Sequence, residues 1–558
     1  MWTLFHPVAD VVIFICALAV SILIGKLGSS GRRSAVPFLE RLAFHPARCC
    51  LFIATVAFVG SAIVSLTGKF PEPRVHDEFS YLLAADTFAN GRLTNPTHPQ
   101  WLSFESMHIL QKPTYASRYP PAQGLIMAAG QVVGGHPMVG VWLSAALGSG
   151  AICWMLMGWL PPHWALYGSL LAVLRLGIGG YWSQSYFGGW VAAIGGALLL
   201  GGLRRTIERP RISSSLVMAL GLVILANSRP LEGAIIALPC AVLILGFVVR
   251  RTWFGNRDTL TRIVAPVCLV LIVTALWIGY YNQSVTGDPL KMPHQLYSET
   301  YMTAPYFLFS EPRPQPRYRN AAIARFHKHW EQRVFKAQLS FAGWLEHRIA
   351  AFSGLWKFYL GVALGIPLLL LFSSRSDPWL LFAVFLWLLY LGLTLVMTWN
   401  MPHYSALLAP LVFYLVVQGV RVALSSDRWH SIGQHLFRIL PLYCLGSLAY
   451  GLVSPQDLFA WPHDSDFQAR RAQTLEELEV EGGRHLILVR YGKNHRVHDE
   501  WVYNGADIDS AQVVWARAMH PARNRRLLSH FHDREAWLFE PDNPEARLQP
   551  FPRESPSR

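Results

Sequence analysis

Long apolar runs alternate with short basic connections along most of the chain, and this is the pattern of a polytopic membrane protein. A run of about 17 to 25 apolar residues is long enough to cross the hydrocarbon core as a helix. The runs predict about twelve transmembrane helices, near residues 8–26, 48–68, 137–158, 163–181, 189–203, 213–229, 233–250, 262–281, 352–372, 378–397, 405–424 and 436–453. Composition agrees, because 52% of the 558 residues are hydrophobic and only 15% are charged, which excludes a soluble protein of this size.

Three longer polar segments divide the chain. We expect a transmembrane module over residues 1–453 that carries two outer loops, 69–136 and 282–351, and a soluble domain over residues 454–558. In this tail, helix-like and strand-like segments alternate, which is typical of a small α/β domain with a parallel sheet. The expected helices are 466–481 and 522–531, and the expected strands are 485–491, 513–516 and 536–539.

The distribution of Lys and Arg predicts the orientation in the cell membrane. Basic residues gather in the short connections of one side, such as 26–48, 204–211 and 250–262, and that side is therefore cytoplasmic. Both outer loops are longer than about 60 residues, so their own basic residues do not count against this topology. The outer loops and the tail then lie outside the cytoplasm. The first run has no basic residue before it, so we expect an uncleaved span with its N-terminus outside.

The formal net charge of +14 is unevenly placed. Residues 454–558 hold 14 Lys and Arg against 17 Asp and Glu, a net of −3, so the rest of the chain carries +17. That excess is typical of topology signals and of contact with anionic lipid, and it indicates no nucleic-acid partner. The seven cysteines lie within or at the ends of apolar segments, so the sequence predicts no disulfide framework and no Cys metal site.

Two adjacent carboxylates, Asp77 and Glu78, follow the second apolar run in the first outer loop. The spacing of the apolar residues from Asp77 to Asn90 predicts an amphipathic helix lying on the membrane surface. Neighbours in a helix point about 100° apart, so the two carboxylates cannot form one clamp. One of them can face a substrate while the other orients a partner or meets a backbone amide.

Cations come after these acids along the chain. Lys112 precedes Pro113, Arg118 precedes Tyr119, and Arg229 precedes Pro230 at the outer end of a later apolar run. Lys and Arg at headgroup depth are suited to bind a phosphate group. Residues 124–133 are apolar but too short to cross the bilayer, so we expect a re-entrant or interfacial segment beside a cavity. In the second outer loop, Asn320 to Arg348 is predicted as one basic helix.

A DxD triplet, Asp507 to Asp509, stands in the tail. Such a triplet holds a metal in soluble sugar-nucleotide transferases, but Asn504 and Gly505 beside it are typical of a turn and a helix cap. We therefore assign no metal ligand, and a divalent metal as cofactor stays open. The sequence contains neither a P-loop nor a G-x-G-x-x-G in the required context, so nucleotide-driven chemistry is not indicated.

The order of these parts resembles the GT-C superfamily of integral-membrane glycosyltransferases. Within it, the likeness is to the family 39-like group that depends on polyprenyl-phosphate sugars and includes protein O-mannosyltransferases and lipid A aminoarabinose transferases. The resemblance covers about residues 48–424. The matching parts, besides a C-terminal soluble domain, are Asp77-Glu78, Tyr81, Lys112-Pro113 or Arg118-Tyr119-Pro120-Pro121, and Arg229-Pro230.

The resemblance implies transfer of a sugar from a polyprenyl-phosphate donor to a hydroxyl of a lipid, glycan or protein at the outer face of the membrane. Asp77 would be the catalytic base and Glu78 would orient it or the acceptor. The donor phosphate would be bound by Lys112 or Arg118, which fit equally well, and by Arg229. Further candidates for the cavity are Tyr81, Tyr119, His403 and Tyr404. Many relatives carry Arg-Tyr where this chain has His403-Tyr404, and the ordinary pKa of histidine is about 6.5, so a charge there would depend on pH.

Two other classes of function remain as alternatives. A transporter or flippase would place ionisable residues deep in several spans and show inverted repeats, whereas the acids here stand at span ends and in loops. A non-catalytic envelope-assembly protein would account for the tail but not for the order of acids followed by cations.

Overall fold

The computed structural model describes residues 7–26, 36–67, 70–255, 258–373, 377–454, 466–543 and 545–552. The chain divides into two compact units. Unit 1 comprises Met1–Pro71, Met138–Trp277 and Ala342–Pro462, and unit 2 comprises Glu72–Pro137, Ile278–Phe341 and His463–Arg558. Unit 2 therefore unites most of both outer loops with the C-terminal residues, whereas the sequence analysis places these loops in the transmembrane module.

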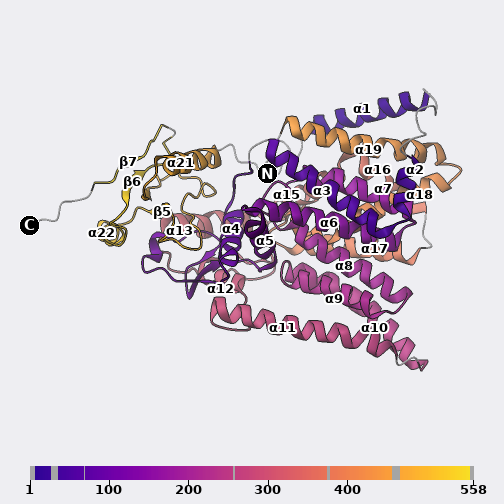
Figure 1. Ribbon diagram of the computed structural model, residues 1–558, viewed down its shortest axis with the longest axis horizontal. Helices are drawn as coiled ribbons and strands as arrows, with labels where there is room; N and C mark the ends of the chain where they lie inside the picture. Colours follow the sequence, from indigo (N-terminus) through magenta and orange to yellow (C-terminus); the bar gives the residue numbers. More distant parts are fainter. Residues whose placement is uncertain are drawn as a thin grey trace, which may run out of the picture. The chain divides into compact units, whose positions relative to one another are not determined.

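Unit 1 is helical, and Figure 1 labels its α-helices. In chain order they are α1 (Pro7–Lys26), α2 (Val36–Ala43), α3 (Pro46–Thr67), α6 (Pro137–Trp159), α7 (Pro162–Ala172), η3 (Val173–Gly177), α8 (Gly189–Glu208), α9 (Ile212–Ala226), α10 (Pro230–Trp253), η4 (Leu260–Val264), α11 (Ala265–Thr286), α15 (Phe341–Tyr359), α16 (Gly361–Leu370), η6 (Leu371–Ser373), α17 (Pro378–Val396), η7 (Pro402–Tyr404), η8 (Ala406–Leu408), α18 (Ala409–Ser425) and α19 (His430–Val453). The end of α11 and the first residue of α15 belong to unit 2.

Eight helices in the described part of the chain are long and apolar enough to cross a membrane, and each coincides with a predicted span. They are α3, α6, α8, α10, η4 with α11, α17, η8 with α18, and α19. A ninth is the pair α15 and α16, which bends by 96° at Leu360. The predicted spans 8–26 and 213–229 are apolar helices of shorter length, and the predicted span 163–181 is broken after α7 by the π-helical turn η3. The chain is a multi-pass membrane protein.

Small residues let the helices at the centre of unit 1 approach closely. Helices α8 and α9 lie side by side (Figure 1). A Cβ on Gly221 of α9 would stand 2.4 Å from the backbone nitrogen of Leu199, and a Cβ on Gly196 would stand 1.8 Å from the carbonyl oxygen of Leu407. In an 18-residue window of the span Ala406–Ser425, 83% of the residues are buried, so this segment lies in the interior of the unit.

Unit 2 combines short helices with two small sheets. Its elements are α4 (His76–Ala89), β1 (Asn95–Pro96), η2 (Trp101–Ser103), β2 (Ile109–Leu110), β3 (Thr114–Ser117), α5 (Ala122–Gly134), α12 (Pro293–Tyr301), α13 (Ala321–Ala324), η5 (Arg325–Glu331), α14 (Gln332–Ala337), α21 (Phe467–Glu481), β4 (His485–Val489), β5 (Val513–Arg517), α22 (Pro521–His530), β6 (Glu535–Phe539) and β7 (Gln549–Pro550). The tail sheet has the order β5-β4-β6-β7, and β4 pairs in parallel with both β5 and β6. The expected parallel sheet is therefore present.

Helix α4 differs from the expected amphipathic helix on the membrane surface. Most of its residues are buried, because its apolar side chains pack against α5 and against the tail. A Cβ on Gly124 of α5 would stand 2.7 Å from the Cβ of Ala84, and the ring of Phe79 stacks on Tyr503 with a centroid distance of 4.1 Å. The apolar pattern was correct, but the apolar face contacts protein.

The expected helix from Asn320 to Arg348 is also interrupted. It divides into α13, η5 and α14, which ends at Ala337, and a new helix, α15, starts at Phe341. Residues 338–340 between them make turns rather than continuing the helix, so the basic segment and the following apolar segment are separate elements.

Candidate functional site

The two adjacent carboxylates stand in the first turn of α4, where an acid interacts favourably with the helix dipole. The side chain of Glu78 turns back along its own chain, and its Oε2 accepts a hydrogen bond from the backbone nitrogen of Arg74 at 2.8 Å. Glu78 is only 2% exposed. Asp77 points elsewhere and its side chain is 27% exposed. The two acids thus have separate tasks: Glu78 holds the entry into the helix, and Asp77 is open to a ligand.

The hydroxyl of Tyr119 joins Asp77 to two basic side chains. It donates a short hydrogen bond to Oδ1 of Asp77, and it lies 3.1 Å from Nη2 of Arg118 and 3.1 Å from Nδ1 of His108. Because the phenol gives its one proton to Asp77, Arg118 and His108 must donate to the phenol oxygen. His108 therefore carries a proton on Nδ1. Burial, together with the nearby Arg118 guanidinium, lowers the pKa of His108 well below its ordinary value, so His108 is neutral.

Arg118 has few polar partners for a partly buried guanidinium. Besides Tyr119, its Nη1 contacts the sulfur of Met302 at 3.5 Å, and its Nε is buried without a hydrogen-bond partner among the described residues. Its remaining neighbours are the faces of Tyr119 and Tyr297, at 5.0 and 4.9 Å. A buried cation is costly unless an anion neutralises it. The position is therefore suited to bind an anionic ligand.

A second arginine, Arg313, adds to the positive charge near Arg118. Its Nη1 is also buried without a hydrogen-bond partner in the part of the chain that the structure describes. Burial, together with Arg118 and Arg313, lowers the pKa of His294 to about 4, so this imidazole is neutral and leaves the two guanidinium groups as the cations. Sequence reasoning missed Arg313, which stands in a Pro-rich segment without periodicity. The only available signal was a basic residue between two prolines.

A buried hydrogen-bonded chain supports the backbone of His108. Glu331 Oε2 lies 2.6 Å from Nδ1 of His327, whose Nε2 lies 2.9 Å from the hydroxyl of Tyr297, and that oxygen accepts from the backbone nitrogen of His108 at 2.8 Å. His108 has a φ of 63°, an uncommon left-handed conformation for a residue with a side chain. Tyr297 thus stabilises a strained turn beside the candidate base.

The predicted residues of unit 2 fall into two groups. Asp77, Arg118 and Tyr119 come together, and the ring of Tyr81 stacks on Tyr119 with a centroid distance of 4.4 Å. Lys112 lies apart from this cluster, with its Nζ 4.8 Å from the centre of the Trp101 ring. Tyr119 and His108, which contact Asp77, make no described contact with Lys112.

The predicted residues of unit 1 form their own cluster. Arg229 is the residue before Pro230 at the start of α10, and its guanidinium lies 4.5 Å from the centre of the Tyr404 ring. Nδ1 of His403 is 2.9 Å from the hydroxyl of Tyr181. Burial, together with Arg229, lowers the pKa of His403 well below its ordinary value. His403 is therefore neutral, and Arg229 is the cation of this cluster.

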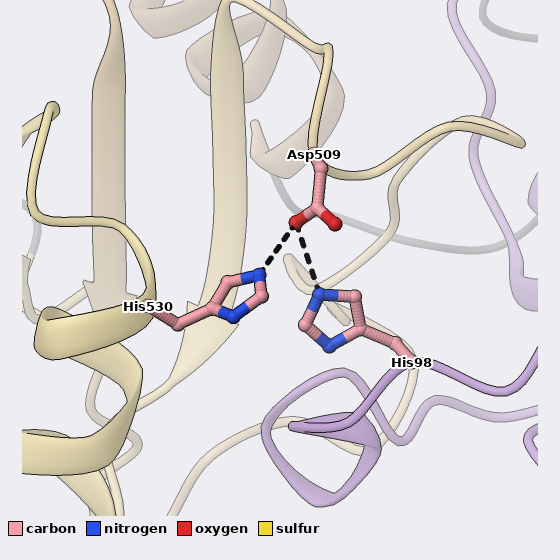
Figure 2. A group of neighbouring side chains, drawn as sticks. All are labelled: His98, Asp509 and His530. Atoms are coloured by element: carbon pink, nitrogen blue, oxygen red, sulfur yellow. Dashed lines mark hydrogen bonds and ion pairs between the residues drawn. The ribbon is translucent and has the colours of Figure 1, made fainter.

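The second aspartate of the DxD triplet contacts two histidines, and Figure 2 shows the three side chains. Nε2 of His98 and Nε2 of His530 lie 3.0 and 2.9 Å from the same oxygen of Asp509. The backbone nitrogen of Gln100 donates to Nδ1 of His98 at 2.9 Å, so the proton of the neutral ring is on Nε2. A metal ligand must offer an unprotonated nitrogen. The arrangement therefore fits a hydrogen-bonded clamp between the first outer loop and α22 better than a metal centre.

Asp507 does not join this clamp. Its Oδ1 accepts from the backbone nitrogen of Ser510 at 3.3 Å, which is the hydrogen bond of a turn. The two aspartates of the triplet thus point to different partners. A metal-binding role for the triplet would require both of them on one ion.

Comparison with known proteins gave matches in structure only, and no family model and no curated protein sequence matched the chain. The chain is similar to ArnT from Cupriavidus metallidurans in the apo state, with a TM-score of 0.49 and 14% identity over 91% of this chain and 94% of that chain. For ArnT bound to undecaprenyl phosphate the values are 0.47, 12%, 91% and 93%. For the oligosaccharyltransferase of Archaeoglobus fulgidus in the apo form they are 0.43, 9%, 80% and 62%. Both kinds of protein are members of the GT-C superfamily. At sequence identities this low, the similarity concerns the path of the backbone and does not extend to the roles of individual residues.

Proposed function

We propose that this protein is a membrane glycosyltransferase that moves a sugar from a polyprenyl-phosphate donor to an acceptor hydroxyl on the outer face of the membrane. One observation carries the proposal: the partly exposed carboxylate of Asp77 and the partly buried guanidinium of Arg118 are bound to the same phenol oxygen. A base for the acceptor and a cation for the leaving phosphate thus stand on either side of one residue.

The reaction is a single displacement at the anomeric carbon. Asp77 accepts the proton of the acceptor hydroxyl as that oxygen attacks the sugar. The bond between the anomeric carbon and the phosphate oxygen breaks, and the polyprenyl phosphate leaves with the electron pair. Arg118 stabilises the developing negative charge, and Arg313 adds a second guanidinium. The configuration at the anomeric carbon is inverted.

The other predicted residues take supporting roles in this proposal. Glu78 acts through the amide of Arg74 and so positions Asp77. Tyr81 and Tyr119 form the aromatic wall beside the base. In unit 1, Arg229 stays a predicted phosphate-binding residue, and Tyr404 stays a predicted residue of the cavity. Lys112 is assigned a different role below.

The membrane determines the donor. Outside the cytoplasm there is no pool of nucleotide sugars, so a glycosyl donor must arrive on a lipid carrier with its phosphate at headgroup depth. The basic connections of the predicted cytoplasmic side support a position of the Asp77 loop on the opposite side. The acceptor class, whether lipid, glycan or protein, is left to experiment.

The direct test is transfer by the purified protein. It is incubated with a panel of polyprenyl-phosphate sugars and cell-envelope fractions, and products are identified by mass. Asp77→Asn is expected to lower the rate by about 10²- to 10⁴-fold, the usual contribution of a general base. Glu299→Gln is the matched control, because that carboxylate is exposed and its ion-pair partner in the described part of the chain is Lys291. Full activity of a correctly inserted Asp77→Asn protein would refute the base assignment.

A labelling experiment tests on which side of the membrane unit 2 lies. Val133 of α5 is 87% exposed, so Val133→Cys offers a reactive thiol in unit 2. In intact cells, a membrane-impermeant maleimide is expected to label this variant and not the parent protein. Labelling only after the cytoplasmic face is opened would rule out an outward-facing site.

A further inference from the structure

A second cationic cavity lies in unit 2, outside the contacts of Asp77. It has a volume of 220 Å³, and we call it the Trp101 pocket. Its walls include Trp101, Glu105, Lys112, Tyr301, Arg317 and Arg319. Neither Asp77 nor Arg118 nor Tyr119 lines it.

Three cations surround this pocket. Nζ of Lys112 and the guanidinium carbon of Arg319 lie 4.8 and 5.4 Å from the centre of the Trp101 ring, and Arg317 completes the set. All three side chains are exposed, so a ligand from solution can reach them. None of the three makes an ion pair with a carboxylate within the described ranges of the chain. Like charges so close to one another repel, and an anion between them would relieve that repulsion.

The single carboxylate among the lining residues is already engaged. Glu105 is 4% exposed. One of its oxygens accepts from the hydroxyl of Tyr301 at 3.0 Å, and the other accepts from the side-chain amide of Asn320. Glu105 therefore organises the wall of the pocket, and its single negative charge offsets only one of the three cations. The pocket retains an excess of positive charge for a ligand.

Two tyrosines connect the pocket with the Asp77 cluster. The rings of Tyr301, which lines the pocket, and Tyr297 are 4.9 Å apart, and Tyr297 is in contact with Arg118. The lining also offers groups that suit a sugar, namely the indole of Trp101, the phenol of Tyr318 and the amide of Gln111. Aromatic faces together with a few polar groups are typical of a small-molecule site.

We propose that the Trp101 pocket binds an anionic saccharide, a sugar unit of the acceptor that carries a phosphate or a carboxylate. This assignment rests on the proposed glycosyl transfer and gives its acceptor a chemical class. Lys112, Arg317 and Arg319 bind the anion, and the reacting hydroxyl of the same acceptor extends toward Asp77. Arg118 and Arg313 bind the donor phosphate, and Lys112 is part of the binding site for the acceptor.

Binding is measured by calorimetry on the full-length protein in nanodiscs of uncharged phosphatidylcholine. The probes are glucose 6-phosphate, glucuronate, uncharged glucose and farnesyl phosphate. Glucose 6-phosphate and glucuronate are expected to bind at least tenfold more tightly than glucose. The double variant R317Q/R319Q should bind both anionic sugars at least tenfold more weakly than the parent protein. Its affinity for farnesyl phosphate should be unchanged. The matched control R523Q/R526Q removes two exposed arginines of α22. It should change neither the affinity for the anionic sugars nor the affinity for farnesyl phosphate.

Three results would overturn the assignment. Equal binding of glucose and glucose 6-phosphate would show that charge is not recognised. If Arg118→Gln lost the binding of glucose 6-phosphate and R317Q/R319Q kept it, the anion would bind at the donor site. If R317Q/R319Q lost the binding of farnesyl phosphate, the pocket would be part of the donor site. Transfer by Asp77→Asn at the full rate would instead contradict only the proposed function, because these binding measurements need no turnover.

Discussion

Tyr119 donates its phenolic hydrogen bond to Oδ1 of Asp77, and this bond fixes where the neighbouring protons lie. The phenol oxygen keeps its lone pairs for Arg118 and for Nδ1–H of His108. The second carboxylate oxygen of Asp77 lies 3.6 Å from His108, too far for a strong hydrogen bond, so it can accept the proton of an incoming hydroxyl. The phenol thus orients the base and keeps it apart from the cation.

Replacing Tyr119 with Phe tests this arrangement. Without the hydroxyl, Asp77 loses its short hydrogen bond, and Arg118 keeps only the contact with the Met302 sulfur among the described residues. We expect kcat to fall by about 10- to 100-fold, the effect of about 1 to 3 kcal/mol when buried polar groups lose a partner. Tyr115→Phe is the control, because the Tyr115 hydroxyl donates to the carbonyl of Asn504 and has no contact with Asp77 among the described residues. Equal kcat for the two variants would contradict a special role for Tyr119.

The buried pair of Glu331 and His327 supplies a second prediction, on stability. Glu331→Gln keeps a carbonyl oxygen for Nδ1–H of His327, but it removes the negative charge and puts an NH₂ in place of the other carboxylate oxygen at this 3%-exposed site. We expect a loss of about 1 to 3 kcal/mol in stability, seen as a lower melting temperature. The exposed pair of Lys291 and Glu299 is the comparison, and Glu299→Gln should cost less than about 1 kcal/mol. Similar melting temperatures for both variants would count against the Glu331–His327–Tyr297 chain as a support.

The sequence predicted those parts of the fold that depend on local patterns. Eight of the expected spans coincide with long apolar helices, because the bilayer imposes a minimum apolar length that a single run reveals. The parallel sheet of the tail was equally visible, since β4, β5 and β6 are short apolar runs separated by helical segments. Helix α4 shows the limit of such patterns, because an apolar face has the same spacing whether lipid or protein covers it.

The candidate site could be predicted only in part, because contacts between distant segments leave no local signal. The order of acid and cation pointed to Asp77, Arg118 and Tyr119, which do meet. Lys112 has an equally good motif, yet its contacts are with Trp101. Arg313 carries no motif, and only the fold brings it near His294 and Arg118.

Acid is expected to destabilise unit 2 through His294. Its folded pKa is about 4 and the ordinary value is about 6.5, so the unfolded chain binds the proton first as the pH falls. Stability is therefore complete above about pH 6.5 and decreases as the pH falls toward 4, by about 2 kcal/mol at pH 5. Buried His108, whose pKa is also lowered, acts in the same direction. The drop in melting temperature between pH 7.5 and pH 5.0 should be smaller in His294→Gln. An unchanged drop would show that this histidine does not titrate as proposed.

Arg313 allows the donor site to be tested by two independent measurements on one variant. In Arg313→Gln the leaving phosphate loses a cation that acts most strongly in the transition state, so kcat should fall by about 10- to 100-fold with a smaller change in KM for the donor. The same variant removes one of the charges that lower the pKa of His294, so that pKa should rise and the acid-induced loss of melting temperature should shrink. Arg490→Gln, on an exposed arginine that pairs with Glu540, should change neither quantity. A shifted acid profile with unchanged kcat would place Arg313 beside His294 yet away from the reacting phosphate, and the donor assignment would then rest on Arg118 alone.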